Sequence, residues 1–231
     1  MTLPGAKGQL LIAYLVLNRL RRIARDELLD AVYGEAAAPS HHPRLSVLLS
    51  RVRRVVGPEL LTGRSTIEFV LTPDAFVDVE AALDALHRAE SHVAKCEWAE
   101  AWGPSTLAYD VTSRPLMRGH DRPWLDDWRR RLDDARLSAL ESVAAASLGI
   151  GGPELPQAAN RARQLIELAP FRESGHRILM EALARSGNAA EALRVYDRLR
   201  IMLRDELGIA PSPAVRDVHR RLLGSTATTA G

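Results

Sequence analysis

Four arginines lie between residues 44 and 54, and they are the side chains of this chain best suited to recognition chemistry: Arg44, Arg51, Arg53 and Arg54. A guanidinium offers two parallel donors that fit O6 and N7 of guanine, and it also grips phosphate. The cluster therefore points to nucleic acid as a ligand, provided that one element presents the arginines on one side.

A helix over residues 43–56 does this. Its apolar residues Leu45, Leu49, Val52 and Val56 are spaced 4, 3 and 4 apart, which predicts one stripe facing the core. The opposite side carries Val47, Ser50, Arg51 and Arg54, flanked by Arg44, Ser46 and Arg53. The same periodicity suits a helix whose arginines are merely solvated, so periodicity alone leaves both interpretations open.

The surrounding sequence predicts two further helices and a strand hairpin. One helix covers about residues 5–18. A second begins at Arg25, with acidic residues in its first turn, and ends at Tyr33-Gly34. Residues 60–62 and 66–71 read as short strands around a turn at 63–65. Three helices followed by a hairpin predict a winged helix-turn-helix.

The second half of the chain has the spacing of a helical repeat. Gln157-Ala158 lies 34 positions before Glu191-Ala192, and Leu165 lies 34 before Leu199. A period of 34 with small and apolar residues in register is typical of tetratricopeptide repeats. Each helix hairpin then exposes an apolar face that a neighbouring hairpin must cover, so this half is predicted to present a surface rather than a catalytic pocket.

Other candidate sites favour structural roles. The glycines at 149–152 lack the lysine of a phosphate loop and predict a helix break. His41-His42 lies in an expected loop without further metal ligands. Cys96 is expected on a helix as a half-buried thiol. Asp126-Asp127 and Asp133-Asp134 alternate with arginines, which predicts a salt-bridged helix face. We expect no enzyme, no cofactor and no metal.

Four tryptophans stand at helical spacing in two pairs: Trp98, Trp102, Trp124 and Trp128. They could form an aromatic cage, but at this spacing they more often pack between helices. A long helix is expected from Trp124 to about Leu148, after a helical region over 81–101.

Charge divides the chain of 231 residues unevenly. Residues 1–72 hold 10 Lys/Arg and 6 Asp/Glu, and the remainder holds 21 and 23. A basic first segment suits a reader of nucleic acid. One cysteine fits a reducing cytoplasm, and the apolar run at 10–17 is far shorter than a membrane span. We expect a cytoplasmic protein with no membrane contact.

The C-terminal motifs resemble the bacterial transcriptional activator domain of the Streptomyces antibiotic regulatory protein family. The ordered set that carries the resemblance is Pro170-Phe171-Arg172-Glu173, Glu191-Ala192-Leu193, Tyr196, Asp205-Glu206-Leu207-Gly208, Pro211-Ser212-Pro213 and His219. The resemblance also covers Pro123-Trp124 and residues 136–141. It implies an activator whose helical repeats contact RNA polymerase or a second copy.

Residues 25–34 and 50–54 resemble the response-regulator type of winged helix that precedes this domain in the same family. By that resemblance Ser46, Val47 and Arg51 face bases. Arg44, Ser50, Arg53 and Tyr33 lie near phosphates, and Arg64 sits on the wing. Two departures stand out: the small sheet that usually leads the family's winged helix is missing, and Leu48 occupies a groove-side position that commonly holds His or Tyr.

The sequence therefore predicts a mainly α protein with a winged helix-turn-helix at 1–73, a helical-repeat activator domain at 74–223 and a disordered tail at 224–231. Its expected partners are double-stranded promoter DNA, RNA polymerase and a second copy as a homodimer. Two alternatives stay open: a protein-interaction scaffold with a degenerate winged helix, and a regulatory fragment of a larger signalling protein.

Overall fold

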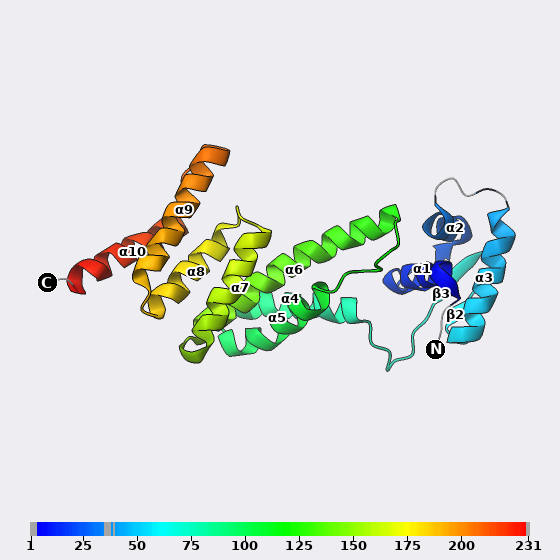
Figure 1. Cartoon of the computed structure of the whole chain (residues 1–231). Coiled ribbons are helices and arrows are strands. Elements are labelled where there is room, and N and C mark those ends of the chain that lie inside the picture. The colour runs from blue at the N-terminus through cyan, green and yellow to red at the C-terminus, as the bar shows by residue number, and fades with distance from the viewer. Residues whose placement is uncertain (1–3, 35–37, 39, 230–231) are drawn as a thin grey trace. The chain divides into compact units, whose positions relative to one another are not determined.

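The structure, a computed structural model, describes residues 4–34, 38 and 40–229 (Figure 1). It divides into two compact units. The N-terminal unit comprises residues 1–77 and 115–130, and the repeat unit comprises 78–114 and 131–231. The predicted boundary near residue 73 cuts the chain once, whereas the N-terminal unit also takes in a segment from the middle of the chain.

Three helices and a small sheet form the N-terminal unit. The helices are α1 (Gly5–Leu17), α2 (Arg25–Tyr33) and α3 (His41–Val56). The strands are β1 (Ile23–Ala24), β2 (Leu61–Thr62) and β3 (Thr66–Phe69), and they form an antiparallel sheet in the order β1-β3-β2. The predicted winged helix-turn-helix is thus present, with two differences: α3 begins at His41 rather than Pro43, and β1 was not expected.

One apolar core holds this unit together. Leu11 and Leu15 of α1, Leu28 of α2, Leu45 and Leu49 of α3 are all nearly inaccessible to solvent. Across the sheet, Ile23 pairs with Ile67 and Leu61 pairs with Phe69, and all four side chains join the same core. Burial of these side chains is the main force that fixes α3 against α1 and α2.

The hairpin turn requires glycine at position 63. Gly63 has a φ of 90°, and a Cβ there would lie 1.9 Å from the carbonyl oxygen of Thr66. Any side chain would clash with backbone that cannot move without breaking the β2–β3 pairing. The turn that carries Arg64 therefore has a defined shape.

Residues 115–130 complete the N-terminal unit. The indole of Trp124 donates to the Ala31 carbonyl at 3.1 Å, and Arg122 donates to the Val32 carbonyl at 3.0 Å. Both acceptors lie in the last turn of α2, where helical carbonyls have no partner within the helix. The Trp124 ring also meets Tyr14 edge to face, with centroids 5.0 Å apart. These contacts cap α2 with side chains from about 90 residues further along the chain.

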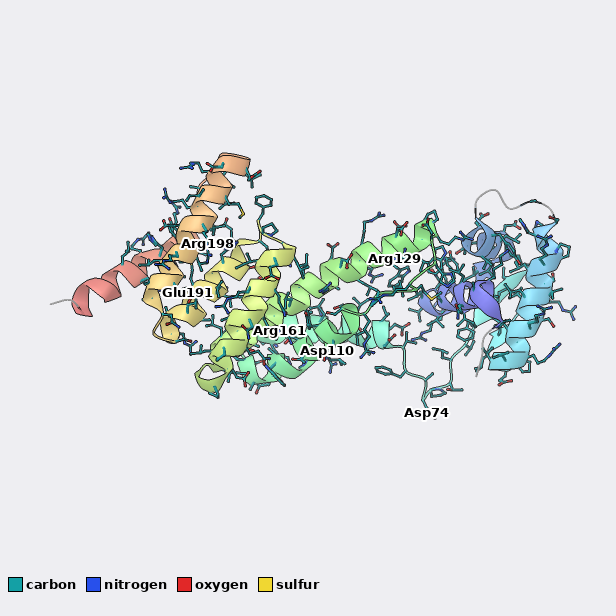
Figure 2. The ribbon with its side chains drawn as sticks, viewed as in Figure 1. Asp74, Asp110, Arg129, Arg161, Glu191 and Arg198 are labelled. Atoms are coloured by element: carbon teal, nitrogen blue, oxygen red, sulfur yellow. The ribbon has the colours of Figure 1, made fainter. Side chains whose placement is uncertain are left out.

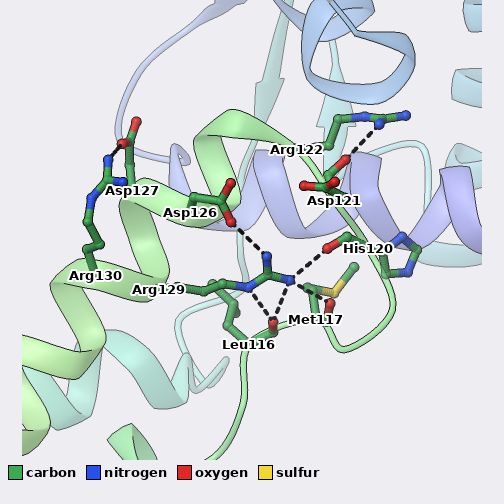
Figure 3. Close-up of polar contacts among 9 residues, drawn as sticks. All are labelled: Leu116, Met117, His120, Asp121, Arg122, Asp126, Asp127, Arg129 and Arg130. Carbon is green, nitrogen blue, oxygen red and sulfur yellow. Dashed lines mark hydrogen bonds and ion pairs between the residues drawn. The ribbon is translucent and has the colours of Figure 1, made fainter.

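Arg129 fixes the loop before α6 (Pro123–Ile150), whose first residues belong to this segment (Figure 3). Its guanidinium donates to the carbonyls of Leu116, Met117 and His120 and to the carboxylate of Asp126. Arg130 pairs in turn with Asp127. The predicted salt-bridged face is therefore confirmed for these two aspartates, but Arg129 also serves as a hydrogen-bond centre for the loop.

The repeat unit is entirely helical in the part that the structure describes. After α4 (Asp78–Ala94), α5 (Trp98–Thr112) and the rest of α6 come the turn η1 (Gly152–Glu154), α7 (Leu155–Leu168), α8 (Glu173–Arg185), α9 (Ala189–Leu207) and α10 (Pro213–Thr229). The mainly α fold predicted from the sequence is confirmed. Helix α10 ends at Thr229, past residue 224 where a disordered tail was expected.

Paired helices interlock through the predicted repeat positions. Leu183 of α8, together with Tyr196 and Leu199 of α9, belongs to one buried cluster. The Tyr196 ring stacks on His219 of α10 with centroids 3.8 Å apart. The Glu173 carboxylate accepts a 2.7 Å hydrogen bond from the Ser212 amide and so ties the start of α8 to the loop before α10. The motif residues of the resemblance thus serve packing between successive helices.

One expectation for this unit was wrong, and two others hold. A turn at 95–97 separates α4 from α5, and there Cys96 is exposed with a φ of 59°, so it is neither helical nor half-buried. Helix α6 ends at Ile150 and Gly151 has a φ of 72°, so the predicted helix break in the glycines at 149–152 is confirmed. A Cβ at Gly149 would lie 2.2 Å from the Trp98 ring, so glycine is needed for that close approach. The predicted packing of tryptophans between helices is confirmed for Trp98, whose ring lies against Gly149 of α6, and for Trp124, whose ring meets Tyr14 of α1.

Candidate nucleic-acid interface

Helix α3 presents the predicted polar face to solvent. The exposed residues are Arg44, Ser46, Val47, Ser50, Arg51 and Arg54. The buried side consists of Leu45, Leu48, Leu49 and Val52. Leu48 is only 8% exposed, so the expectation that it occupies a groove-side position was wrong. Its side chain belongs to the core of the unit, and Val47, 51% exposed, is the apolar residue that faces outward.

The charge of this face is not neutralised. Helix α3 contains four arginines and no acidic residue. Within the described part of the chain, Arg44, Arg51 and Arg54 form no ion pair with a carboxylate. A row of unpaired guanidinium groups on one helix face is a favourable site for a polyanion.

Arg53 is used differently from its neighbours. Its Nε donates to the Leu61 carbonyl at 2.8 Å, and its guanidinium also donates to the Gly63 carbonyl at 2.5 Å. In this structure the side chain joins α3 to the wing, the hairpin of β2, β3 and the turn between them. The prediction that Arg53 lies near phosphate remains untested, but two of its donors already have acceptors within the protein.

Ser46 also has partners within the protein. Its hydroxyl donates to the His42 carbonyl at 3.1 Å and accepts from Arg25 at 2.7 Å. Arg25, the first residue of α2, further donates to the main-chain carbonyl of Arg64 at 3.2 Å. The sequence reasoning missed Arg25. The helix dipole disfavours a cation in the first turn of a helix. The position of Arg25 in the sequence was therefore the available signal that this residue has another role.

Tyr33, the last residue of α2, lies in a basic and aromatic cluster. Lys7 Nζ lies 4.2 Å from the ring centroid, and His41 stacks on the ring at 4.6 Å. Burial raises the pKa of the Tyr33 hydroxyl, and the charge of Arg44 opposes that shift. A cavity of about 570 Å³ adjoins the cluster; its lining includes Lys7, Tyr33, Arg44, Val47 and Arg51 and contains no acidic side chain among the described residues. Lys7 is a second residue that the sequence reasoning missed.

The wing carries Arg64 at its exposed turn. Arg64 therefore projects from the same unit as the α3 face, and the main chain of its turn is held by Arg25 and Arg53. All nine predicted contact residues (Tyr33, Arg44, Ser46, Val47, Ser50, Arg51, Arg53, Arg54 and Arg64) thus lie in the N-terminal unit, on α2, α3 or the wing. Whether they contact DNA stays a prediction.

Comparison with known proteins identifies the class. Residues 77–223 match the bacterial transcriptional activator domain. Regulatory protein AfsR of Streptomyces coelicolor is 33% identical over 220 residues, which are 92% of this chain and 21% of that protein. Transcriptional regulator RedD of the same organism is 36% identical over 91 residues, 39% of this chain and 25% of RedD. The chain thus spans about a fifth of the length of AfsR.

A solved structure shares the fold over nearly the whole chain. Mycobacterium tuberculosis EmbR, in complex with a low affinity phosphopeptide, superposes with a TM-score of 0.84 at 21% identity and covers 97% of this chain and 61% of the EmbR chain. The two chains therefore share their fold over this length. The chain belongs to the Streptomyces antibiotic regulatory protein family of bacterial transcriptional activator domain proteins, as the sequence motifs predicted. The named relatives are a regulatory protein and a transcriptional regulator.

A helix that crosses a membrane needs about 20 predominantly apolar residues. Over the described residues, none of the helices has the length and apolar character for this.

Proposed function

We propose that this regulator binds double-stranded promoter DNA by placing α3 in the major groove. One observation carries the proposal: Arg44, Arg51 and Arg54 are exposed on a helix without acidic residues, and they have no ion-pair partner in the described part of the chain. Arginine pairs with guanine through two parallel hydrogen bonds, and an α-helix fits the width of the groove. Val47 supplies an exposed apolar contact for a thymine methyl group.

The wing and the residues beside Tyr33 would bind backbone. Arg64 would reach the phosphates or the minor groove next to the site read by α3, and Ser50, Arg44 and Tyr33 would hold phosphates on its flank. Backbone contacts fix register, whereas base contacts fix sequence. Promoter DNA is found in the bacterial cytoplasm, and there we place the protein.

The repeat unit would supply the activating contact. We infer that it binds RNA polymerase, or a second copy bound to an adjacent DNA repeat, because its packed helices offer an extended exposed surface. The stoichiometry on a duplex with two sites, measured by analytical ultracentrifugation, tests the second copy. Transcription from a bound promoter with purified RNA polymerase tests the contact with the polymerase.

The central test is binding of the full chain to DNA as salt rises. A random-sequence duplex pool selected with the wild-type chain supplies the probe. The logarithm of the affinity should fall steeply with the logarithm of salt, with a slope of about −0.9 per neutralised phosphate. A flat response, or no duplex retained at low salt, would contradict the proposal and favour a protein-interaction scaffold.

A further inference from the structure

Arg25 bridges the two elements that would read DNA. One of its terminal nitrogens donates to the Ser46 hydroxyl on α3 at 2.7 Å, and the other donates to the Arg64 carbonyl in the wing turn at 3.2 Å. Ser46 lies 21 residues away along the chain and Arg64 lies 39 away. The fork geometry of a guanidinium, with two nitrogens aimed at separate acceptors, is what allows one side chain to hold both.

Among the described residues, no other side chain hydrogen-bonds to the main chain of residue 64 at the tip of the wing turn. Arg53 binds the carbonyls of Leu61 and Gly63, so it fixes strand β2 and the first residue of the turn to α3. Arg25 comes from α2 and fixes the next residue. Residues 63–66 are exposed, so the turn is not packed into the core of the unit.

The electrostatic context argues that the placement of Arg25 is specific. As the first residue of α2 it faces the positive end of the helix dipole, which disfavours a cation. Its hydrogen bonds go to a hydroxyl and a carbonyl, and none of the ion pairs found among the described residues includes it. Its positive charge is therefore available near the two DNA-facing elements while its donors are engaged between them.

We propose that Arg25 is a positioning residue for DNA recognition, which sets the distance between the Arg64 side chain on the wing and the reading face of α3. This inference rests on the proposed function. Its consequence is that the wing contact and the α3 contact engage DNA at one fixed spacing. Without Arg25, the Arg64 side chain would still be present, but the wing turn would no longer hold it in position for its DNA contact.

A double-mutant cycle tests the inference, because Arg25 binds the main chain of residue 64 and not its side chain. Arg64→Ala keeps the carbonyl acceptor and removes only the DNA contact. With the duplex selected by the wild-type full chain, Arg25→Ala and Arg64→Ala should each weaken binding roughly tenfold, and the double variant should be little weaker than either one. Arg25→Lys should behave like Arg25→Ala, since an ammonium does not hold both acceptors in the fork geometry.

Arg22→Ala is the matched control. Arg22 also carries a positive charge on the N-terminal unit, but it pairs with the Glu68 side chain at 3.2 Å and touches no turn carbonyl. It should leave the coupling between positions 25 and 64 unchanged. If Arg25→Ala and Arg64→Ala are additive and the salt slope of Arg25→Ala falls by about one phosphate, Arg25 is itself a phosphate contact and the inference is wrong.

Hydrogen exchange in the absence of DNA gives an independent readout. Arg25→Ala should speed exchange of the amides at 64–66, whereas Arg22→Ala should not. Unchanged exchange overturns the inference even if the wild type binds DNA. If the wild-type chain selects no duplex at all, the proposed function fails first, and with it the role of Arg25 in recognition.

Discussion

Three arginines of α3 and several arginines of the helical repeats have opposite surroundings. In the repeat unit Arg163 pairs with Glu191 of α9, which Figure 2 labels, Arg177 pairs with Glu181 and Arg220 pairs with Asp217. On α3, Arg44, Arg51 and Arg54 lack such partners in the described residues. These repeat arginines are neutralised on the surface of their own unit, whereas the three arginines of α3 are left open to a ligand.

This difference separates two uses of the same residue type. Exposed ion pairs on a helix contribute at most about 1 kcal/mol to stability, so the repeat arginines mainly balance charge on a solvated surface. A row of unpaired arginines contributes little to folding stability, and its positive charges repel one another. Such a row is expected where a polyanion supplies the neutralising charge. The two units should therefore respond in opposite ways to substitution, one in stability and the other in binding.

The largest expected effect is on the stability of the repeat unit. Leu183, 4% exposed, packs in the cluster that includes Tyr196 and Leu199. Leu183→Ala should cost about 2–5 kcal/mol through lost burial and the cavity left behind. Denaturant unfolding of the full chain measures this, and transcription activation should fall with it. Arg194→Glu, at an exposed position of α9, is the control and should change stability by about 0.5 kcal/mol or less.

The next effect is on binding. Arg51→Ala should weaken the affinity for the selected duplex by about 1–3 kcal/mol and relax the choice of base at one position, because it removes a bidentate contact. The midpoint of thermal unfolding should barely change, since Arg51 is exposed and touches no described carboxylate. Unchanged affinity together with a lower midpoint would mean that Arg51 is structural and that the reading face of α3 is misassigned.

A smaller effect is expected where residues 115–130 cap α2. Trp124→Phe keeps a ring against Tyr14 but removes the donor to the Ala31 carbonyl, which should cost about 0.5–1.5 kcal/mol. Chemical denaturation followed by circular dichroism measures the loss. Trp102→Phe is the control because Trp102 is 36% exposed on α5. Equal losses in both variants would show that the cap on α2 contributes nothing specific.

Local patterns made much of this fold predictable. The stripe of Leu45, Leu49 and Val52 and the 34-residue period both repeat over short distances, so they appear in the sequence itself. The predicted hairpin was also local, with Gly63 at its turn. The contact residues on α3 were found as an exposed set for the same reason, because one helix face is fixed by spacing alone.

The features that were missed depend on contacts between distant residues. Strand β1 has only two residues and exists because Ile23 and Ala24 pair with β3. Arg25 acquires its role from Ser46 and Arg64, which no spacing rule links to it. The inward direction of Leu48 agrees with its helix pattern, because it lies three residues after Leu45 and four before Val52; the family resemblance alone had assigned it to the groove side. Tertiary packing decided the cases of β1 and Arg25, and local preference did not.

The smallest expected effect concerns the paired arginines themselves. Arg220 lies 3.2 Å from Asp217 one turn away on α10, and both side chains are more than half exposed. Arg220→Ala should change the free energy of unfolding by less than about 0.5 kcal/mol, because such a pair is screened by water and salt. It should also leave the affinity for the selected duplex and its salt slope unchanged, since a neutralised charge on the repeat unit releases no counterion from DNA. Parallel salt titrations of Arg220→Ala and Arg51→Ala decide the matter. If both variants lower the slope equally, DNA senses the net charge of the chain, and the contrast between open arginines on α3 and paired arginines on the repeats does not explain binding.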